Sequence, residues 1–338
     1  MIARPLACAA TALAAVTLAA CGSSGSASTA PPTSSAPSTT TTTTAATTTT
    51  PLPGQGKPPV VIGDKNYTEQ FVLGELYYEA LQAQGFSVTI DQNIGATAVT
   101  MKALQIGQLH MYPEYLNVWN AQIAGYTRHF TTLYGPHGAF EAAQNYALAH
   151  GLELLDPTPF SDTAGIAVTA NFAGQNALGT IRSLGRVPTS VTLGGPPQFQ
   201  HDPIAGLPAL ERAYDFIPGA YKSLEIGNQY KALDQDTVQA AYVNSTDGEL
   251  TTSNYNLLSD PRKVFGIGNV VPVVSAKTLN EEGPVFAQTI NKVSALLTLP
   301  AIRELNALVD LSGEAPAGVA SRFLADHGLI PPSSVITS

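Results

Sequence analysis

An apolar run followed by an amphipathic segment, between Val60 and Gly85, constrains the fold of this chain more than any other stretch. Residues 60–62 are Val-Val-Ile and predict a buried strand, and Gly63 follows as a turn residue. The next apolar residues recur at helical spacing and predict a helix that ends at Gly85. They are Leu73, Leu76, Tyr77, Ala80 and Leu81.

Polar residues gather where this strand ends and the helix begins. Asn66, with Glu69 three residues later, has the pattern of a capping box and predicts the helix start. Lys65, Thr68 and Gln70 fall at the same place. Backbone N–H groups and the positive end of the helix dipole point outward there, which favours binding of a small ligand. The alternative is that these residues only cap the helix.

The same alternation of strand and helix continues along the chain. Strands are predicted at 86–90 and 109–112, with a helix over 95–106 between them. The order β-α-β-α-β is typical of a parallel sheet. A helix over 140–150 and a strand over 152–155 follow.

A second unit is predicted from near Pro157. Residues 260–275 are extended in pattern and return the chain to the first unit. Three C-terminal helices have no strands of their own, so we expect them to pack on the first sheet. The strands of the second unit are predicted at 166–169, 190–193 and 238–243, its helix at 203–213, and the C-terminal helices at 281–298, 300–311 and 317–327.

These patterns predict an α/β protein of two lobes with a cleft between them. Lobe I comprises residues 58–157 and 260–338, and lobe II comprises residues 158–259. The first lobe is therefore built from two separate parts of the chain.

The first 21 residues have the pattern of a secretory signal. Arg4 precedes an apolar run over residues 5–19, which is too short to be a membrane span. Leu18-Ala19-Ala20-Cys21 then resembles the bacterial lipobox, in which cleavage after residue 20 leaves Cys21 as a lipid-modified N-terminus. An ordinary signal peptide is the alternative. Because Cys8 leaves with the signal, the mature chain keeps one thiol and forms no internal disulfide.

Residues 21–57 form a linker by composition. From Gly22 to Gly56 there is no charged residue and little besides Ser, Thr, Ala, Pro and Gly. Such a segment buries too little apolar surface to offset the entropy of ordering, so it is expected to stay extended. We interpret it as a tether between a membrane anchor and the globular part.

Composition and motifs argue against several function classes. The formal net charge of −9 and the lack of Lys/Arg clusters argue against nucleic-acid binding. No nucleophile elbow, phosphate loop or His-Glu-x-x-His motif is present, so no enzyme activity is predicted. The histidines are scattered, so neither a metal nor another cofactor is expected. We interpret Glu69, Glu75 and Glu79 as part of a solvated helix face.

Several motifs in the same order as in a known family carry a resemblance. The chain resembles the substrate-binding proteins of ABC importers for osmoprotectants, the glycine betaine/choline/carnitine-binding family, over residues 58–331. The motifs are Ile62-Gly63-Asp64-Lys65-Asn66-Tyr67-Thr68-Glu69-Gln70, Gly95-Ala96-Thr97 with Tyr112-Pro113-Glu114-Tyr115, Gly194-Gly195-Pro196-Pro197-Gln198-Phe199, and Ser245-Thr246-Asp247-Gly248.

The resemblance implies a fold and a kind of site. The fold is the type II periplasmic-binding-protein-like fold, in which two α/β lobes close on the ligand about a hinge. A quaternary ammonium group is held over tyrosine faces by cation–π attraction, and a ligand carboxylate takes donors such as Lys, Gln or Thr. Lys65 and Gln70 match ligand-contacting positions of the family, and Tyr115 matches the first tyrosine of the cage.

The other three tyrosines of the family's cage are replaced in this chain. They fall on Ala164, Asn244 and Gly268. The cage is thereby reduced to Tyr115, unless neighbouring aromatic residues rebuild it. The neighbours considered are Phe160, Tyr242 and Trp119.

The function implied is an extracytoplasmic lipoprotein that captures a small zwitterionic or quaternary-amine solute and delivers it to an ABC permease. Two alternatives stay open. The ligand is an amino acid or another polar amine, because the cage is reduced, or the protein is a surface sensory module without a transport partner. The candidate ligand-binding residues are Lys65, Asn66, Gln70, Thr97, Tyr115, Asn117, Phe160, Asp162, Asn244 and Asp247.

The lipobox pattern generates a first prediction. We expect Cys21 to carry diacylglycerol and the protein to partition with membranes on the extracytoplasmic face. Cys21→Ala should release the protein or leave an uncleaved precursor, as measured by cell fractionation and mass spectrometry. Unchanged membrane attachment of a processed Cys21→Ala protein contradicts the anchor.

Overall fold

The computed structural model describes residues 51–126, 135–187 and 190–332. The signal peptide, Cys21 and most of the linker lie outside these residues. The end of the linker is described: Gly54 is buried, and its N–H donates to the carbonyl of Gln84 at the end of the first helix.

Five strands form the sheet of lobe I, in the order β2-β1-β3-β10-β4. β1 pairs in parallel with β2 and β3, which confirms the predicted parallel β-α-β-α-β beginning. β10 lies antiparallel between β3 and β4, so the late segment of the chain completes the sheet. The strands are β1 (Val60–Gly63), β2 (Val88–Asp91), β3 (Met111–Tyr115), β4 (Leu152–Leu154) and β10 (Val270–Ser275).

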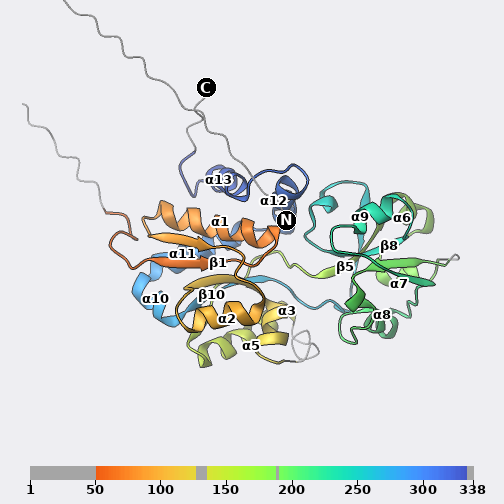
Figure 1. Cartoon of the computed structure of the whole chain (residues 1–338), viewed down its shortest axis with the longest axis horizontal. Helices are drawn as coiled ribbons and strands as arrows, with labels where there is room; N and C mark the ends of the chain where they lie inside the picture. Colours follow the sequence, from red (N-terminus) through yellow and green to blue (C-terminus); the bar gives the residue numbers. More distant parts are fainter. Residues whose placement is uncertain (1–50, 127–134, 188–189, 333–338) are drawn as a thin grey trace, which may run out of the picture. The chain divides into compact units, whose positions relative to one another are not determined.

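Helices cover both faces of this sheet (Figure 1). On one face, Phe286 and Ile290 of α11 share a core with Leu73 and Leu76 of α1, and α12 and α13 also pack on α1. This confirms that the C-terminal helices pack on the first sheet. The helices on this face are α1 (Thr68–Ala83), α11 (Pro284–Leu296), α12 (Leu299–Asp310) and α13 (Pro316–Asp326).

The opposite face has a core of its own around Trp119. Its helices are α2 (Thr97–Gln105), α3 (Leu116–Val118), the π-helical turn η1 (Trp119–Ile123) and α5 (Gly135–Ala149). A short helix that the sequence did not predict, α10 (Ala276–Glu282), is separated from α11 by Gly283, whose φ of 82° ends one helix before Pro284 starts the next.

Lobe II is built on a second five-stranded sheet, in the order β7-β6-β8-β5-β9. β6 is parallel to β7 and β8, whereas β5 is antiparallel to β8 and β9. The edge strands β7 and β9 were not predicted, because their half-exposed residues show little apolar pattern. The strands are β5 (Ala164–Thr169), β6 (Thr192–Gly195), β7 (Ala220–Ser223), β8 (Ala240–Asn244) and β9 (Tyr255–Leu258).

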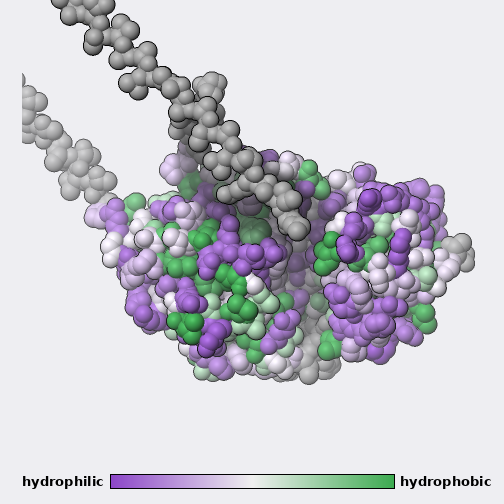
Figure 2. Space-filling model, viewed as in Figure 1, coloured by the Kyte–Doolittle hydropathy of each residue, from purple (hydrophilic) through white to green (hydrophobic). Residues whose placement is uncertain are grey.

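Short helices pack around this second sheet. They are α6 (Ala170–Asn176), α7 (Ile181–Leu184), the 3-10 turn η2 (Pro197–Gln200), α8 (Leu207–Tyr214), α9 (Gln229–Asp234) and the 3-10 turn η3 (Gly248–Thr251). Hydrophilic residues dominate the face of lobe II seen in Figure 2, and hydrophobic ones are scattered among them. The predicted α/β class with two lobes is thus confirmed.

Two chain segments connect the lobes, one between β4 and β5 and one between β9 and β10. They run antiparallel to each other at Ser161 and Asn269. The N–H of Asp162 donates to the carbonyl of Gly268 at 3.0 Å, and the N–H of Gly268 donates to Ser161 Oγ at 2.9 Å. These hydrogen bonds hold the two connecting segments side by side.

The start of α1 differs from the prediction. The helix begins at Thr68 with Tyr67 as N-cap and no side-chain cap, so the capping box of Asn66 and Glu69 is wrong. Glu69 is only 5% exposed, so its assignment to a solvated face is also wrong. Its carboxylate accepts bonds from residues far away in sequence, which the local pattern does not reveal. The predicted stop is confirmed: Gly85 follows the helix with φ of 84°.

Among the residues that the structure describes, no single helix is long and apolar enough to cross a membrane. α11 and α12 satisfy that test only as a pair, and they are bent by 88° at their junction.

The contact between η3 and α12 generates a second prediction. A Cβ on Gly248 would lie 2.6 Å from Cα of Ala307 and 2.8 Å from its N, both backbone atoms. Gly248→Ala should therefore lower the free energy of unfolding by ~1–3 kcal/mol, as for other overpacked sites. Urea unfolding followed by circular dichroism measures the change.

Gly318→Ala in α13 is the matched control. A Cβ there meets no atom within 4 Å. The substitution should leave stability unchanged or raise it by up to ~1 kcal/mol, because alanine favours a helix over glycine. Equal effects of the two substitutions would contradict the tight contact.

Candidate ligand-binding site

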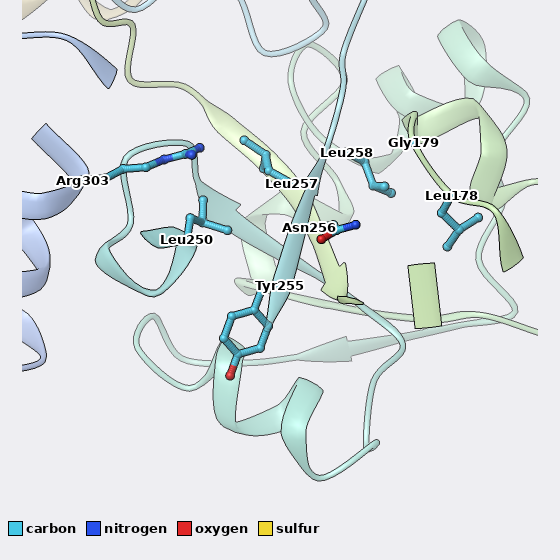
Figure 3. A pocket seen from close by; sticks show the side chains of 8 residues that line it. All are labelled: Leu178, Gly179, Leu250, Tyr255, Asn256, Leu257, Leu258 and Arg303. Carbon is cyan, nitrogen blue, oxygen red and sulfur yellow. The ribbon is translucent and has the colours of Figure 1, made fainter. Parts of the chain in front are cut away.

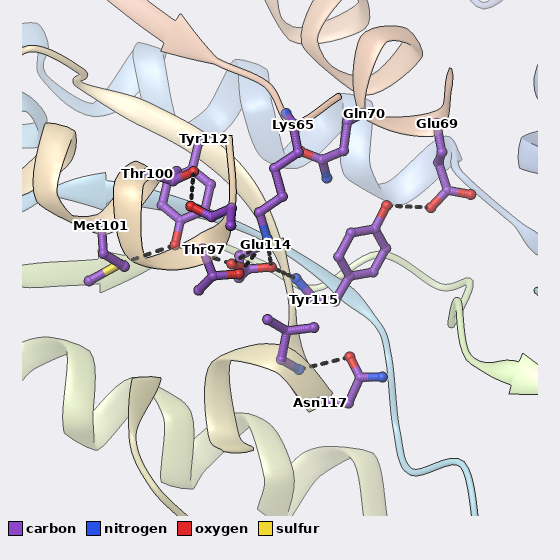
Figure 4. A network of polar contacts seen from close by, with 12 residues as sticks. Lys65, Glu69, Gln70, Thr97, Thr100, Met101, Tyr112, Glu114, Tyr115 and Asn117 are labelled. Carbon is purple, nitrogen blue, oxygen red and sulfur yellow. Dashed lines mark hydrogen bonds and ion pairs between the residues drawn. The ribbon is translucent and has the colours of Figure 1, made fainter. Parts of the chain in front are cut away.

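Lys65 follows β1 and forms a buried ion pair with Glu114 of β3 (Figure 4). Its Nζ lies 2.6 Å and 2.7 Å from the two carboxylate oxygens and 3.1 Å from Oγ1 of Thr97 at the start of α2. An ammonium group has three N–H donors, so these three acceptors use them all. Lys65 therefore has no donor left for a ligand carboxylate, in contrast to the role that the resemblance implies.

The environment of Glu114 explains this pairing. Burial raises the pKa of Glu114, whereas the charge of Lys65 and the hydrogen bonds from it lower the pKa again. One carboxylate oxygen also accepts the N–H of Tyr115 at 2.9 Å, and the other accepts Tyr112 OH at 3.4 Å. The bond to Glu114 thus holds the backbone of Tyr115, the residue that the resemblance assigns to the aromatic cage.

Gln70 retains an unused donor. Its Oε1 accepts the backbone N–H of Lys65 at 3.3 Å. Its Nε2 is buried and has no hydrogen-bond partner among the described residues. In Figure 4 the amide lies between Lys65 and Tyr115. Gln70 is therefore the group of this cluster that can donate to a polar ligand.

Two tyrosines and a carboxylate lie next to this cluster. The ring centroids of Tyr67 and Tyr115 are 6.2 Å apart with an interplanar angle of 32°. Tyr115 OH donates to Glu69 Oε1 at 2.7 Å. Asn306 Nδ2 of α12 donates to Glu69 Oε2 at 3.0 Å and to the carbonyl of Thr246 at 3.0 Å. Glu69 of α1 is thereby linked through Tyr115 to β3 and through Asn306 to the segment after β8.

Asp162 brings a second carboxylate to the same region from the first connection between the lobes. Ser245 Oγ donates to the carbonyl of Ser161 at 3.0 Å and lies 3.5 Å from Asp162 Oδ1. Burial raises the pKa of Asp162 well above its usual value, and the negative charge of Glu69 raises it further. Burial also raises the pKa of Glu69, against the hydrogen bonds that it accepts. Two acidic groups from different segments therefore share one buried environment.

A third carboxylate, Asp247, follows β8. Its Oδ2 accepts the N–H of Asn244 at 3.1 Å and Tyr230 OH at 3.0 Å. Burial raises the pKa of Asp247 to about 6, although these two hydrogen bonds lower it. The predicted residues Asp162, Asn244 and Asp247 thus come together at the lobe II end of the connections.

The three replaced cage positions also lie together. Ala164 of β5 is directly opposite Asn244 of β8 in the antiparallel register. A Cβ on Gly268 would lie 1.7 Å from the carbonyl oxygen of Asp162, so a larger residue does not fit there in this conformation. The aromatic faces are therefore missing from the lobe II side, while Tyr67 and Tyr115 remain on the lobe I side.

The residues proposed to rebuild the cage are placed differently from one another. Phe160 and Trp119 are 1% and 0% exposed and fill the two cores of lobe I. The structure thus places Phe160 in a core and not on an open surface. Tyr242 packs on Phe199 with ring centroids 5.0 Å apart. It is two residues before Asn244 on β8 and shares its face, so Tyr242 is the remaining candidate for a third aromatic side.

Two predicted residues stand apart from these hydrogen bonds. Asn66 is exposed, and Asn117 Oδ1 accepts the N–H of Val118 at 2.9 Å. The ligand contacts of the predicted residues stay predictions. Sequence reasoning missed the roles of Tyr67, Glu114 and Asn306; the motif Tyr112-Pro113-Glu114-Tyr115 was the one signal for Glu114.

Comparisons with known proteins give consistent matches. A family model described as the substrate binding domain of ABC-type glycine betaine transport system matches residues 58–326. The glycine betaine-binding protein YehZ of Escherichia coli (strain K12) is 30% identical over 288 residues, covering 82% of this chain and 93% of YehZ. A glycine-betaine-binding protein of Pseudomonas aeruginosa is 28% identical over 284 residues, covering 80% and 88%. The structure of apo YehZ superposes with a TM-score of 0.70 at 29% identity, covering 80% and 99%.

The buried ion pair generates a third prediction. Glu114→Leu leaves the Lys65 ammonium buried beside a side chain without charge, which typically costs ~3–5 kcal/mol of unfolding free energy. Urea unfolding of the purified chain measures this loss. The double variant Lys65→Met, Glu114→Leu removes both charges and should recover most of it. A single variant as stable as the parent would contradict the pairing.

Proposed function

The chain belongs to the family of substrate-binding domains of ABC-type glycine betaine transport systems, and we propose that it captures a small solute with a cationic nitrogen between its lobes and delivers it to an ABC permease. The family consists of solute-binding proteins, and we propose no catalytic activity for this chain. The relatives named for glycine betaine support an osmoprotectant of that kind as ligand.

One observation carries the proposal: two adjacent tyrosines lie beside the buried carboxyl groups of Glu69 and Asp162, which form no ion pair with any residue that the structure describes. The rings of Tyr67 and Tyr115 offer faces to a cationic nitrogen. Glu69 and Asp162 lie in the same buried region, where burial raises the pKa of both carboxyl groups and a neighbouring cation would favour their ionised form. The nearby ammonium of Lys65 is already paired with Glu114. A positively charged ligand would therefore supply the cation that the buried carboxyl groups of Glu69 and Asp162 do not find in the protein.

The hydrogen bonds of Lys65 also limit which protein groups can bind the carboxylate end of a zwitterionic ligand. With the donors of Lys65 used, the Nε2 of Gln70 is the donor of the cluster that is free for a ligand carboxylate. We therefore expect the cationic end to contribute more binding free energy than the carboxylate end.

A second candidate ligand is an amine that carries N–H groups. The Oδ1 of Asn306 is buried without a partner among the described residues, and it belongs to the amide that contacts Glu69. Asp162 contributes a carboxyl group to the same region. Both groups accept hydrogen bonds, which a quaternary ammonium does not donate. Loss of aromatic faces at Ala164, Asn244 and Gly268 favours the same chemistry.

We also propose that the mature protein is attached to the outer face of the membrane through a lipid on Cys21. The apolar run over residues 5–19 and the lipobox pattern support this anchor. The uncharged linker that follows would let the globular part reach a permease in the same membrane.

The tyrosine faces generate a fourth prediction. Titration calorimetry of the full-length chain with glycine betaine should show binding. Tyr115→Ala should weaken it by about 2- to 30-fold, the equivalent of ~0.5–2 kcal/mol for one aromatic face. Tyr115→Phe keeps the ring and removes the hydrogen bond to Glu69, so it should bind nearly as the parent does.

Acidification gives a second readout of the same titration. Burial raises the pKa of Asp247 to about 6, so its carboxyl group is mostly ionised only above that pH. Affinity for a cation should thus fall as the pH is lowered through about 6.

Absence of binding for glycine betaine, together with binding of a primary amine such as ethanolamine, would favour the second candidate. Binding of neither would refute a cationic ligand.

A further inference from the structure

Two ionisable residues outside the candidate site have contrasting surroundings. Arg303 of α12 lines a cavity of about 390 Å³, where water can solvate its guanidinium group (Figure 3). Asp64, which follows β1, is 0% exposed. An ionised carboxyl group at Asp64 would lack solvent, and burial of an uncompensated charge is strongly unfavourable. The protonation state of Asp64 therefore affects the packing around it.

One oxygen of the Asp64 carboxyl group is hydrogen-bonded and the other is not. Oδ1 accepts the N–H of Asn93 at 3.0 Å. Oδ2 is buried and has no hydrogen-bond partner among the described residues. It faces Gly74 of α1, where a Cβ would lie 2.9 Å from it. The absence of a side chain at Gly74 thus makes room for the carboxyl group against the helix.

The charges around Asp64 favour its neutral form. Within the described chain, no nitrogen of a basic side chain lies within 4.0 Å of its carboxyl oxygens, and the ammonium of Lys65, next in sequence, is paired elsewhere. The pKa of Asp64 is raised to about 7, mainly by burial, against the hydrogen bond from Asn93. The negative charges of Glu75 on α1 and Asp91 on β2 also raise this pKa. At mildly acidic pH, Asp64 is therefore protonated.

Asp64 also holds the loop that leads from β2 to α2. Besides its side-chain bond, its N–H donates to the carbonyl of Asp91 at 3.2 Å, and its carbonyl accepts the N–H of Ile94 at 3.0 Å. α2 begins shortly afterwards at Thr97, whose Oγ1 accepts a hydrogen bond from Nζ of Lys65 at 3.1 Å. A displacement of this loop would therefore loosen a contact of Lys65.

We propose that Asp64 is a proton-dependent positioning residue: when neutral it holds the loop over residues 91–96 closed on α1, and when ionised it loosens this loop and the contact of Thr97 with Lys65. Ionisation favours a motion that brings the carboxylate to water, because the buried carboxylate has no compensating charge.

The direction of the pH dependence follows from proton linkage. With the loop closed, Asp64 keeps its proton up to a pKa of about 7, whereas in an open loop it would release the proton near the ordinary pKa of 3.8. Opening therefore becomes easier as the pH rises from about 4 to about 7, by up to about tenfold for each pH unit. Above about pH 7 both forms are ionised, so opening should not change further.

Hydrogen exchange of the ligand-free, full-length chain measures this opening, read by mass spectrometry on a peptide that covers residues 92–100. Asp64→Asn keeps the shape of the side chain and does not ionise. Dividing the exchange rate of the parent by that of the variant at the same pH cancels the chemical effect of pH on exchange. This ratio should rise at least tenfold from about pH 5 to about pH 7 and then stay level. A ratio that is constant or falls over that range would overturn the proposal.

A second pair of variants keeps Asp64 in place. Glu75→Gln removes a negative charge that raises the pKa of Asp64, so exchange, corrected for the rate of the unfolded chain, should level off at a lower pH than in the parent. Glu79→Gln makes the same change one turn further along α1, at a charge that does not act on Asp64, and should leave that pH unchanged. Equal behaviour of the two variants would also overturn the proposal. Because the chain is ligand-free in both experiments, their failure would leave the proposed function intact.

Discussion

The ion pair between Lys65 and Glu114 is the interaction on which the lobe I side of the site depends. It joins the end of β1 to β3 and, through Thr97, to the start of α2. Glu114 also accepts the N–H of Tyr115, so the ring is held relative to the lysine. Two charges taken out of water need this complete set of partners. The arrangement therefore joins the ends of β1 and β3 and uses the N–H donors of Lys65 within the protein.

The consequence is a site with two buried carboxyl groups and, among the described residues, no cation paired with them. Glu69 and Asp162 come from α1 and from a connection between the lobes, and both are buried. Burial of two carboxylates without a cation is unfavourable, and a proton or a positively charged ligand relieves it. Together with the rings of Tyr67 and Tyr115, this balance explains why a cationic solute fits the family to which the chain belongs.

α12 links the two lobes as well as covering α1. Asn306 contacts Glu69 of lobe I and Thr246 beyond β8, while Arg303 contacts Ser245. The absence of a side chain at Gly248 lets η3 approach the backbone of Ala307. Substitution of Asn306 would therefore remove contacts to both lobes.

The sequence by itself determined the α/β class, the parallel start of the first sheet and the placement of the C-terminal helices, because apolar periodicity and glycine stops are local. Its motifs also singled out Lys65, Gln70 and Tyr115 as candidate ligand contacts, which stay predictions. It did not determine that Glu69 is buried, that Lys65 is fully paired or that Ala164 lies opposite Asn244. Those facts depend on partners such as Asn306, 237 residues from Glu69. Only the tertiary structure brings such partners together, since burial and hydrogen bonding are decided by long-range packing.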